Sequence, residues 1–177
     1  MSGADELAPD IVDVGAAADF EEFAASRWPG LVRLAYGLTG DRWLAEDLAQ
    51  TALARAYASW WRVRRAADPD AYLYRILINS SNRRFRRRRV AEQPGEVPEI
   101  SVPDHAASVD DRADLLDALR ELPPRQRAVV LLRYWADLTD TQTAAALGCT
   151  PATVRSQAAR ALEKLRITLT SGGDTRG

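Results

Sequence analysis

Apolar residues recur three and four positions apart along most of this chain, and this spacing predicts helices. The first helix starts at a capping residue, Asp19, and the sequence Trp28-Pro29-Gly30 is expected to interrupt or kink it. Gly40-Asp41 ends that helix and caps a second one, which reaches about Trp60. A third helix starts at Asp68-Pro69, with the aspartate as its cap. Since no stretch has the alternating pattern of a strand, we expect an all-α fold.

A second helical unit is predicted in the C-terminal half of the chain. Leucines at helical spacing precede Pro123-Pro124, an apolar run covers residues 129–132, and two more helices lie between Thr139 and about Leu169. Residues 91–109 contain three prolines, one glycine and four acidic residues, without apolar periodicity. We therefore expect two small helical bundles joined by a flexible acidic linker. The expected parts are a flexible tail (1–18), the first bundle (19–90), the linker (91–109), the second bundle (110–170) and a C-terminal tail (171–177).

The second bundle ends in a pattern typical of a helix-turn-helix. Thr139 and Gln142 form a capping box, Gly148 can end that helix in the left-handed conformation, and Thr150-Pro151 starts the next. Two helices joined by a turn of about three residues are typical of this DNA-binding motif, although a merely solvated surface helix is the alternative. The residues expected to face the protein are Val154, Ala158, Ala161 and Leu165. The residues expected to contact DNA are Thr153, Arg155, Ser156, Gln157, Arg160 and Lys164.

The net charge of −1 hides a strong asymmetry along the chain. Residues 51–90 carry +9, whereas residues 1–50 carry −7 and residues 91–177 carry −3. The positive segment ends in residues 83–89, of which six are arginine. The dipole at a helix C-terminus explains one or two such cations, but six repel one another unless a polyanion is near. Contact with phosphates is therefore the favoured interpretation, and a solvated helix end is the alternative.

Aromatic residues alternate with cations just before this arginine run. Rings between cations suit single-stranded nucleic acid, whose unstacked bases can rest on them. The alternative is that Trp60, Tyr72 and Tyr74 belong to the core, and that Asn79 and Asn82 are helix breakers rather than base contacts. The residues expected to contact nucleic acid in this half are Trp61, Arg62, Arg64, Arg65, Tyr72, Arg75, Asn79, Asn82, Arg83, Arg86 and Arg87.

Few residues are available for metal or nucleophilic chemistry. Cys149 is the only cysteine and His105 the only histidine, so no internal disulfide can form and a cysteine-based metal site lacks partners. Without a glycine-rich phosphate loop, we expect no metal, no cofactor and no enzyme active site. The acidic N-terminus does not resemble a secretory signal, and no apolar run approaches the roughly 20 residues that cross a bilayer. These features predict a cytoplasmic protein without membrane insertion.

Four motifs occur together in the order and at the spacing of one known family. They are Ala45–Gln50 followed by Arg55-Ala56-Tyr57, similar to region 2.2; Tyr72–Asn79, similar to regions 2.3 and 2.4; Leu119–Arg127, similar to the start of region 4; and Ala144–Leu165, similar to region 4.2. On these motifs the chain resembles the extracytoplasmic-function (ECF) sigma factors, in particular their sigma-E-like subgroup, over about residues 18–170.

The resemblance implies an RNA polymerase sigma factor, which directs the core enzyme to promoters and assists their melting without catalysing a reaction itself. The first bundle, region 2, is then expected to dock on the β′ clamp helices and to capture unstacked bases of the −10 element, with residues 61–70 as the candidate pocket. The second bundle, region 4, is expected to meet the β flap and to read the duplex −35 element. An anti-sigma factor is a further partner in this family, and the holoenzyme is expected at the nucleoid. The residues expected to contact core polymerase are Asp47, Gln50, Leu53 and Arg55.

A free-standing helix-turn-helix regulator is the main alternative. Such a protein needs a dimer surface and binds duplex DNA alone, whereas a sigma factor binds specifically only together with core polymerase. An enzyme is the more remote alternative, because no active site can be assembled from the residues present.

Overall fold

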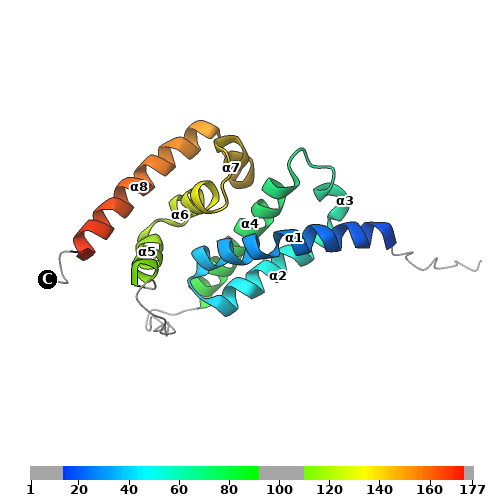
Figure 1. Ribbon diagram of the computed structural model, residues 1–177, viewed down its shortest axis with the longest axis horizontal. Helices are drawn as coiled ribbons and strands as arrows, with labels where there is room; N and C mark the ends of the chain where they lie inside the picture. The colour runs from blue at the N-terminus through cyan, green and yellow to red at the C-terminus, as the bar shows by residue number, and fades with distance from the viewer. Residues whose placement is uncertain (1–13, 92–109, 174–177) are drawn as a thin grey trace, which may run out of the picture.

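The computed structural model describes residues 14–91 and 110–173, and within these residues the chain is helical without any strand (Figure 1). The predicted all-α fold of two bundles is therefore confirmed. The parts of the predicted tails and linker at residues 1–13, 92–109 and 174–177 lie outside the described residues. The elements are α1 (Val14–Thr39), α2 (Arg42–Ala58), α3 (Trp60–Val63), α4 (Pro69–Ala91), α5 (Asp110–Glu121), α6 (Pro124–Val130), the π-helix η1 (Leu131–Trp135), α7 (Asp140–Leu147) and α8 (Pro151–Gly173).

The first bundle consists of α1 to α4, and α2 and α4 start at their predicted caps. The Asp41 side chain accepts a hydrogen bond from the Leu44 N–H at 2.8 Å, and the Asp68 side chain accepts one from the Ala71 N–H at 2.9 Å. The side of α2 that faces its neighbours is lined mainly by alanines, which let α1 and α4 approach closely. The fully buried side chains at the centre of this bundle include Leu31, Leu34, Leu48, Leu73 and Leu77.

Three predicted boundaries were wrong. Helix α1 begins at Val14 rather than Asp19, because Ala16, Ala17 and Ala18 are strong helix formers and Ala16 packs against the core. Of the interruption or kink predicted at Trp28-Pro29-Gly30, the interruption is wrong: the helix continues through Pro29, and the buried Leu31 and Leu34 just beyond it hold the next turn against the bundle. Helix α8 continues to Gly173, past its predicted end at about Leu169. The short helix α3 was not predicted.

The second bundle consists of α5 to α8 with the π-helix η1 between α6 and α7. The apolar face predicted for the last helix is confirmed, since Val154, Ala158, Ala161 and Leu165 are all buried. The π-helix was not predicted. It carries Leu131 and Leu132, which are both fully buried, and it ends in a turn at Asp137 with φ of +55°.

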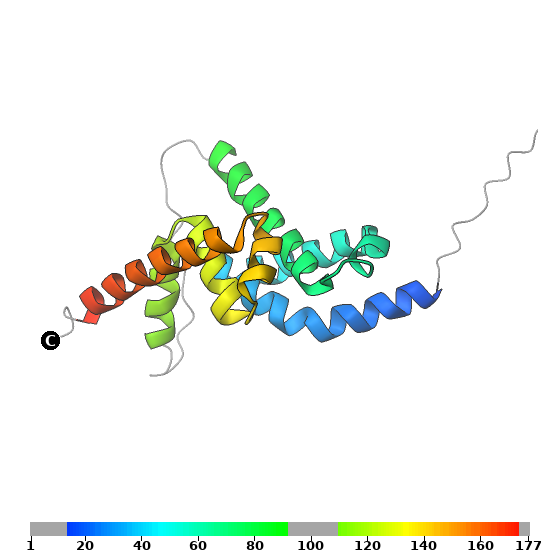
Figure 2. The same ribbon diagram turned by 90° about the horizontal axis from the view of Figure 1, so that it is seen from above.

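The two bundles pack directly against each other. One hydrophobic cluster runs through both, and it includes Leu34 and Leu77 from the first bundle and Leu119 and Leu131 from the second. Helix α7 lies along α4, and η1 and α5 meet the carboxyl end of α1, as Figures 1 and 2 show from two directions. The distal half of α8 and the distal half of α4 extend away from this shared core (Figure 2).

Candidate nucleic-acid interface

The helix-turn-helix has the predicted geometry. Thr139 Oγ1 accepts a hydrogen bond from the Gln142 N–H at 3.2 Å, and Gln142 Oε1 accepts one from the Thr139 N–H at 2.9 Å, so the capping box is complete. Gly148 ends α7 in the left-handed conformation with φ of +64°. Thr150 Oγ1 then accepts from the Thr153 N–H at 3.2 Å, which starts α8 where the sequence predicted.

The amino-terminal half of α8 presents a polar side to solvent. Arg155, Ser156, Arg160 and Lys164 are exposed, whereas Thr153 and Gln157 are half-buried. Two of the hydroxyl groups have local partners: the Thr153 hydroxyl pairs with that of Thr150 at 2.9 Å, and Ser156 Oγ donates to the Thr153 carbonyl at 3.0 Å. Because these hydroxyls are engaged within the helix start, the exposed long side chains on this face are Arg155, Arg160 and Lys164.

Asp140, the first residue of α7, connects α8, the recognition helix of the helix-turn-helix, to η1. Its carboxylate lies 2.8 Å from Arg133 Nε and 3.5 Å from Arg155 Nη1. Asp140 and Arg133 are largely shielded from solvent, whereas the Arg155 side chain is 62% exposed. Sequence reasoning missed this network, because neither Arg133 nor Asp140 belongs to a local pattern that indicates the other.

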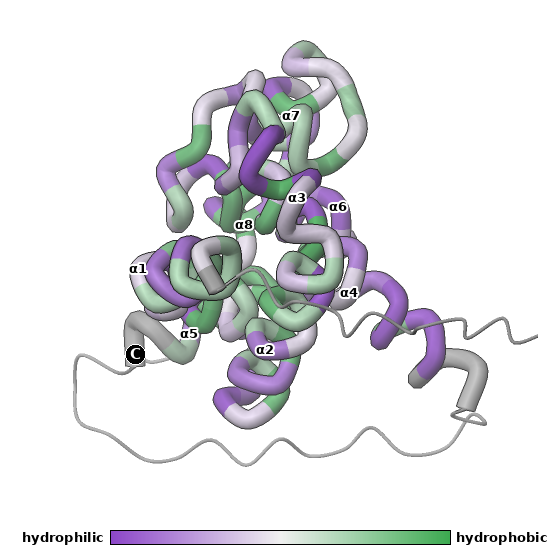
Figure 3. Tube along the Cα trace, turned by 90° about the vertical axis from the view of Figure 1, so that its right-hand side faces the viewer, coloured by the Kyte–Doolittle hydropathy of each residue, from purple (hydrophilic) through white to green (hydrophobic). Residues whose placement is uncertain are grey.

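The distal half of α4 is strongly cationic. Arg83, Arg86 and Arg87 are exposed, and Figure 3 shows this half of the helix as a polar rod that leaves the bundle. A groove of about 390 Å³ lies between this rod and α2. It is lined by Leu48, Thr51, Arg55, Ser80, Arg83, Arg84 and Arg87. A concave surface with four guanidinium groups attracts anions such as phosphates.

Two of the residues predicted to contact core polymerase, Asp47 and Arg55, lie at this groove. Asp47 forms an ion pair with Arg84, and Arg55 Nη1 donates a hydrogen bond to Ser80 Oγ at 2.6 Å. Gln50 is exposed, whereas Leu53 is half-buried and packs against the core. Asp47, Gln50 and Arg55 are therefore on the accessible side of α2, while Leu53 also has a structural role.

The aromatic residues near α3 divide between core and surface. Trp60 is buried against Phe20 and Phe23, with ring centroids 5.2 and 5.0 Å apart. Tyr72 and Tyr74 are half-buried against the same core, and burial raises the pKa of Tyr74. Trp61 is 56% exposed and lies under the Arg62 guanidinium at 4.8 Å.

Core packing of Trp60, Tyr72 and Tyr74 was the alternative that the sequence left open, and the structure favours it. Base contacts by Tyr72 and by Trp61 remain predictions, and Trp61 is more exposed than Trp60, which is buried. Arg62 and Arg65 are exposed beside it, and Arg64 pairs with Asp19 at 3.8 Å.

Arg75, Asn79 and Asn82 are exposed on the side of α4 that faces the second bundle. Together with Ile78 they line one wall of a pocket of about 300 Å³. The opposite wall consists of Pro124, Arg125, Ala128, Ala146, Leu147 and Gly148. Since α4 continues unbroken to Ala91, the two asparagines are not helix breakers.

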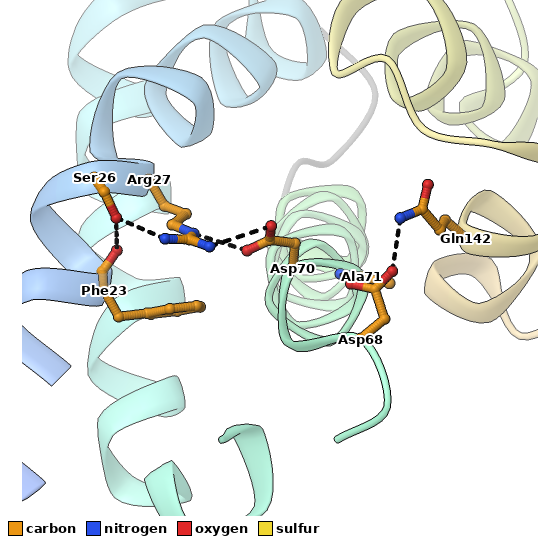
Figure 4. Close-up of polar contacts among 7 residues, drawn as sticks. All are labelled: Phe23, Ser26, Arg27, Asp68, Asp70, Ala71 and Gln142. Carbon is orange, nitrogen blue, oxygen red and sulfur yellow. Dashed lines mark hydrogen bonds and ion pairs between the residues drawn. The ribbon is translucent and has the colours of Figure 1, made fainter. Parts of the chain in front are cut away.

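The first turn of α4 is held from both sides (Figure 4). On one side Asp70 accepts hydrogen bonds from Arg27 Nε at 2.8 Å and from Arg27 Nη2 at 3.4 Å, and this hydrogen bonding raises the pKa of Arg27. On the other side Asp68 Oδ2 accepts from Gln142 Nε2 at 2.7 Å. The hydrogen bond from the Ala71 N–H, assisted by the one from Gln142, lowers the pKa of Asp68. The sequence predicted Gln142 only as a capping residue, so its bond to the other bundle is new.

Among residues 14–91 and 110–173, no group of three or more histidine, cysteine, aspartate or glutamate side chains is arranged to hold a metal ion. None of the helices in this part of the chain is long and apolar enough to cross a membrane.

Two family models match the chain, one for each bundle. The model described as Sigma-70 region 2 matches residues 25–90, and the model described as Sigma-70, region 4 matches residues 112–165.

Several known proteins are similar to the chain over most of its length. It is 42% identical to the RNA polymerase sigma-E factor of Streptomyces antibioticus over 153 residues, which cover 86% of this chain and 85% of that protein. It is 35% identical to the ECF RNA polymerase sigma factor SigL of Mycobacterium tuberculosis over 164 residues, covering 89% of this chain and 90% of that protein. The sigma factor RpoE of Bartonella quintana, solved in complex with the anti-sigma factor NepR, superposes with a TM-score of 0.73 at 31% identity, covering 86% of this chain and 97% of that one.

Proposed function

Because the chain belongs to the sigma-70 family of RNA polymerase sigma factors, which act in transcription initiation, we propose that its two bundles read the two promoter elements separately. The first bundle, region 2, captures the −10 element, and the second bundle, region 4, reads the −35 element. The observation that carries this proposal is the recognition helix, α8: Val154, Ala158, Ala161 and Leu165 are buried against the bundle, whereas Arg155, Arg160 and Lys164 are exposed.

Region 4 supplies duplex recognition in this proposal. The amino-terminal part of α8 enters the major groove, where a guanidinium can bind guanine O6 and N7 through two hydrogen bonds. Arg155 lies within about a turn and a half of the helix start and is the main candidate for such a contact. Lys164 lies further along the helix and is suited to a phosphate.

Region 2 supplies contacts to the melted strand and to core polymerase. Trp61 offers a ring for an unstacked base, and Asn79 and Asn82 offer amide groups for base edges. The arginine rod of α4, which is its distal half with the exposed Arg83, Arg86 and Arg87, binds the phosphate backbone. The exposed side of α2, with Asp47, Gln50 and Arg55, docks on the β′ clamp helices, while region 4 meets the β flap. The protein itself makes or breaks no bond in this role, and it works in the cytoplasm at the nucleoid.

An anti-sigma factor is a further partner in this proposal. The RpoE structure of Bartonella quintana and the CnrH structure were each solved with a bound partner, the anti-sigma factor NepR and the cytosolic domain of CnrY respectively. CnrH is 22% identical to this chain, so that likeness concerns the fold alone.

The decisive experiment titrates the purified protein with core RNA polymerase and measures binding to promoter fragments. We expect sequence-specific binding and run-off transcription only when both proteins are present. Sequence-specific binding to duplex DNA by the protein alone, as a dimer, would instead identify a free-standing helix-turn-helix regulator.

A further inference from the structure

The carboxylate of Asp140 is shared by two guanidinium groups. Asp140 Oδ1 lies 2.8 Å from Arg133 Nε, and Asp140 Oδ2 lies 3.5 Å from Arg155 Nη1. Each oxygen therefore faces a different arginine, one on the π-helix η1 and one on α8. Because Asp140 and Arg133 are largely shielded and Arg155 is exposed, the network leads from a covered ion pair to a side chain at the surface.

Arg133 is held from a second side by its neighbour in η1. Arg133 Nη1 donates a hydrogen bond to Tyr134 Oη at 3.1 Å, and the guanidinium lies over the Tyr134 ring at 5.1 Å from its centre. π-Helical turns are rare and occur frequently at functional sites. With its Nε facing Asp140 and its Nη1 bonded to Tyr134, Arg133 restricts the orientation of the carboxylate.

The backbone that carries Asp140 is also fixed relative to α8. Asp140 is the first residue of α7, directly after the completed capping box. Ala144 of α7 belongs to the same buried cluster as Val154 and Ala158 of α8. The distance from Asp140 to the start of the recognition helix is therefore set by close packing, and not by the ion pair with Arg155.

A carboxylate at this position is unfavourable for the affinity of the recognition helix for DNA. Under the proposed function Arg155 meets a base, so Asp140 beside it comes near the phosphates, which repel a negative charge. The compensating gain is order in Arg155. A long side chain that is already oriented loses less entropy when it binds. The guanidinium has five N–H donors, so a contact at Nη1 leaves enough of them for the two bonds to a base edge.

We propose that Asp140 is a positioning residue for promoter specificity: it holds the Arg155 guanidinium in the orientation that reads a −35 base, and Arg133 in turn holds Asp140. The inference rests on the proposed function, which assigns the base contact to Arg155. Asp140 itself contacts no base in this role. It increases the discrimination between −35 sequences and decreases the affinity for DNA of any sequence.

The test replaces Asp140 with asparagine, which keeps the size of the side chain and removes its charge. Transcription by variant holoenzyme from a library of randomised −35 elements measures the preference at the base pair that Arg155 reads, which is the one where Arg155→Ala changes the preference. Asp140→Asn should reduce the preference at this base pair by roughly 1.5-fold to fivefold, the range for loss of an exposed ion pair. Holoenzyme affinity for promoters with an unrelated −35 sequence should not fall, because a negative charge has been removed. A merely structural role would instead weaken binding to all promoters.

Three further variants separate the possible causes. Asp140→Glu retains the charge and should retain most of the preference. Asp137→Asn removes a carboxylate from the exposed turn before α7 and should leave the preference unchanged, since asparagine tolerates the positive φ of that residue. Asp140→Asn added to Arg155→Ala should leave the ranking as it is in Arg155→Ala alone, because Asp140 acts only through Arg155.

The outcomes distinguish the positioning role from the proposed function. If Arg155→Ala changes the ranking and Asp140→Asn does not, the positioning role is wrong and the base contact stands. A further change when Asp140→Asn is added to Arg155→Ala also overturns the positioning role, since Asp140 then acts on DNA directly. If Arg155→Ala itself changes nothing, the proposed base contact is wrong, and Asp140 has nothing to position.

Asp140→Asn leaves the shielded Arg133 without its anionic partner, which can prevent folding. If circular dichroism shows that this variant does not fold, Asp140→Asn combined with Arg133→Gln removes both charges of the shielded pair. This double variant must then show the same loss of preference at the base pair that Arg155 reads. A folded double variant with the wild-type ranking overturns the positioning role.

Discussion

Asp140 of α7 holds the guanidinium of Arg155 on the recognition helix, at 3.5 Å between Oδ2 and Nη1. Since Asp140 is itself paired with Arg133 at 2.8 Å, the exposed Arg155 side chain has a fixed partner at one of its terminal guanidinium nitrogens. Such an ion pair restricts the directions in which the guanidinium can point, which is what a two-bonded contact to a base edge requires.

This relationship makes Arg155 the first residue to test for promoter specificity. Arg155→Ala should change which −35 sequences are preferred, because a bidentate base contact is worth roughly 1–3 kcal/mol of discrimination. Transcription from a library of randomised −35 elements, with wild-type and variant holoenzyme, measures the ranking. Arg166→Ala, an exposed arginine further along the same helix, is the matched control and should leave the ranking unchanged. Identical rankings for Arg155→Ala and the wild type would show that Arg155 reads no base.

The surface of α2 can be tested by charge reversal. Asp47→Arg should weaken binding to core polymerase, because the substitution places a cation within the predicted docking surface. Folding should be little affected, since an exposed ion pair such as Asp47–Arg84 contributes about 0–1 kcal/mol. The dissociation constant for core polymerase and the circular dichroism spectrum are the measurements.

The matched control for this reversal is Arg84→Gln, which breaks the same ion pair but keeps the carboxylate. Arg84→Gln should bind core polymerase more tightly than Asp47→Arg does. Equal weakening by both variants would mean that the ion pair, and not the Asp47 surface, supports docking.

The capped helix starts of α2, α4, α7 and α8, and the helix-turn-helix, were the parts that sequence could predict. Caps such as Asp41, Asp68, Thr139 and Thr150 act through hydrogen bonds to residues three positions ahead, so their signal is local. The buried face of α8 could also be predicted from the sequence, because the helical period within one segment determines which residues share a face.

The contacts between distant segments could not be predicted in this way. Arg120 and Gly40 meet across the two bundles, and nothing in either local pattern indicates the other. Tyr72 belongs to an aromatic and basic segment whose composition suits nucleic acid, yet its ring packs against the core. Composition reports the chemistry of a segment, whereas burial depends on the neighbours that tertiary packing brings.

Thr143 offers a test of the packing of α7. It is fully buried, and its hydroxyl has no hydrogen-bond partner among the described residues. Thr143→Val removes the unpaired hydroxyl and keeps the shape, so the free energy of unfolding should rise by about 1 kcal/mol. Thr141→Val, at an exposed position in the same helix, should change it by less than about 0.5 kcal/mol. Chemical denaturation measures both; a loss of stability in Thr143→Val would show that the hydroxyl is satisfied.

The lowered pKa of Asp68 predicts a pH dependence. The hydrogen bonds from the Ala71 N–H and from Gln142 favour the carboxylate in the folded state. Its stabilising contribution is therefore complete above the unfolded-state pKa of about 3.9 and is lost as the pH falls through the lower folded value. The stability difference between wild type and Asp68→Asn should be constant from about pH 5 to 8 and should shrink below about pH 4. Denaturation at a series of pH values checks this; a difference that disappears near neutral pH would contradict it.

The arginine rod of α4 is best tested through the salt dependence of DNA binding. Arg86 and Arg87 are exposed, and neither side chain forms an ion pair with any of the described residues, so both are available to phosphates. Replacing both with glutamine should weaken holoenzyme binding to all promoters alike. It should also reduce the slope of log affinity against log salt by roughly 0.9 for each duplex phosphate that the variant no longer neutralises. Arg42→Gln is the control, because Arg42 is also exposed but lies on α2 and pairs with Glu46. If the salt slope of the double variant matches that of the wild type, the arginine rod is a solvated helix end. If the double variant changes the order of promoter preference, these arginines contact bases.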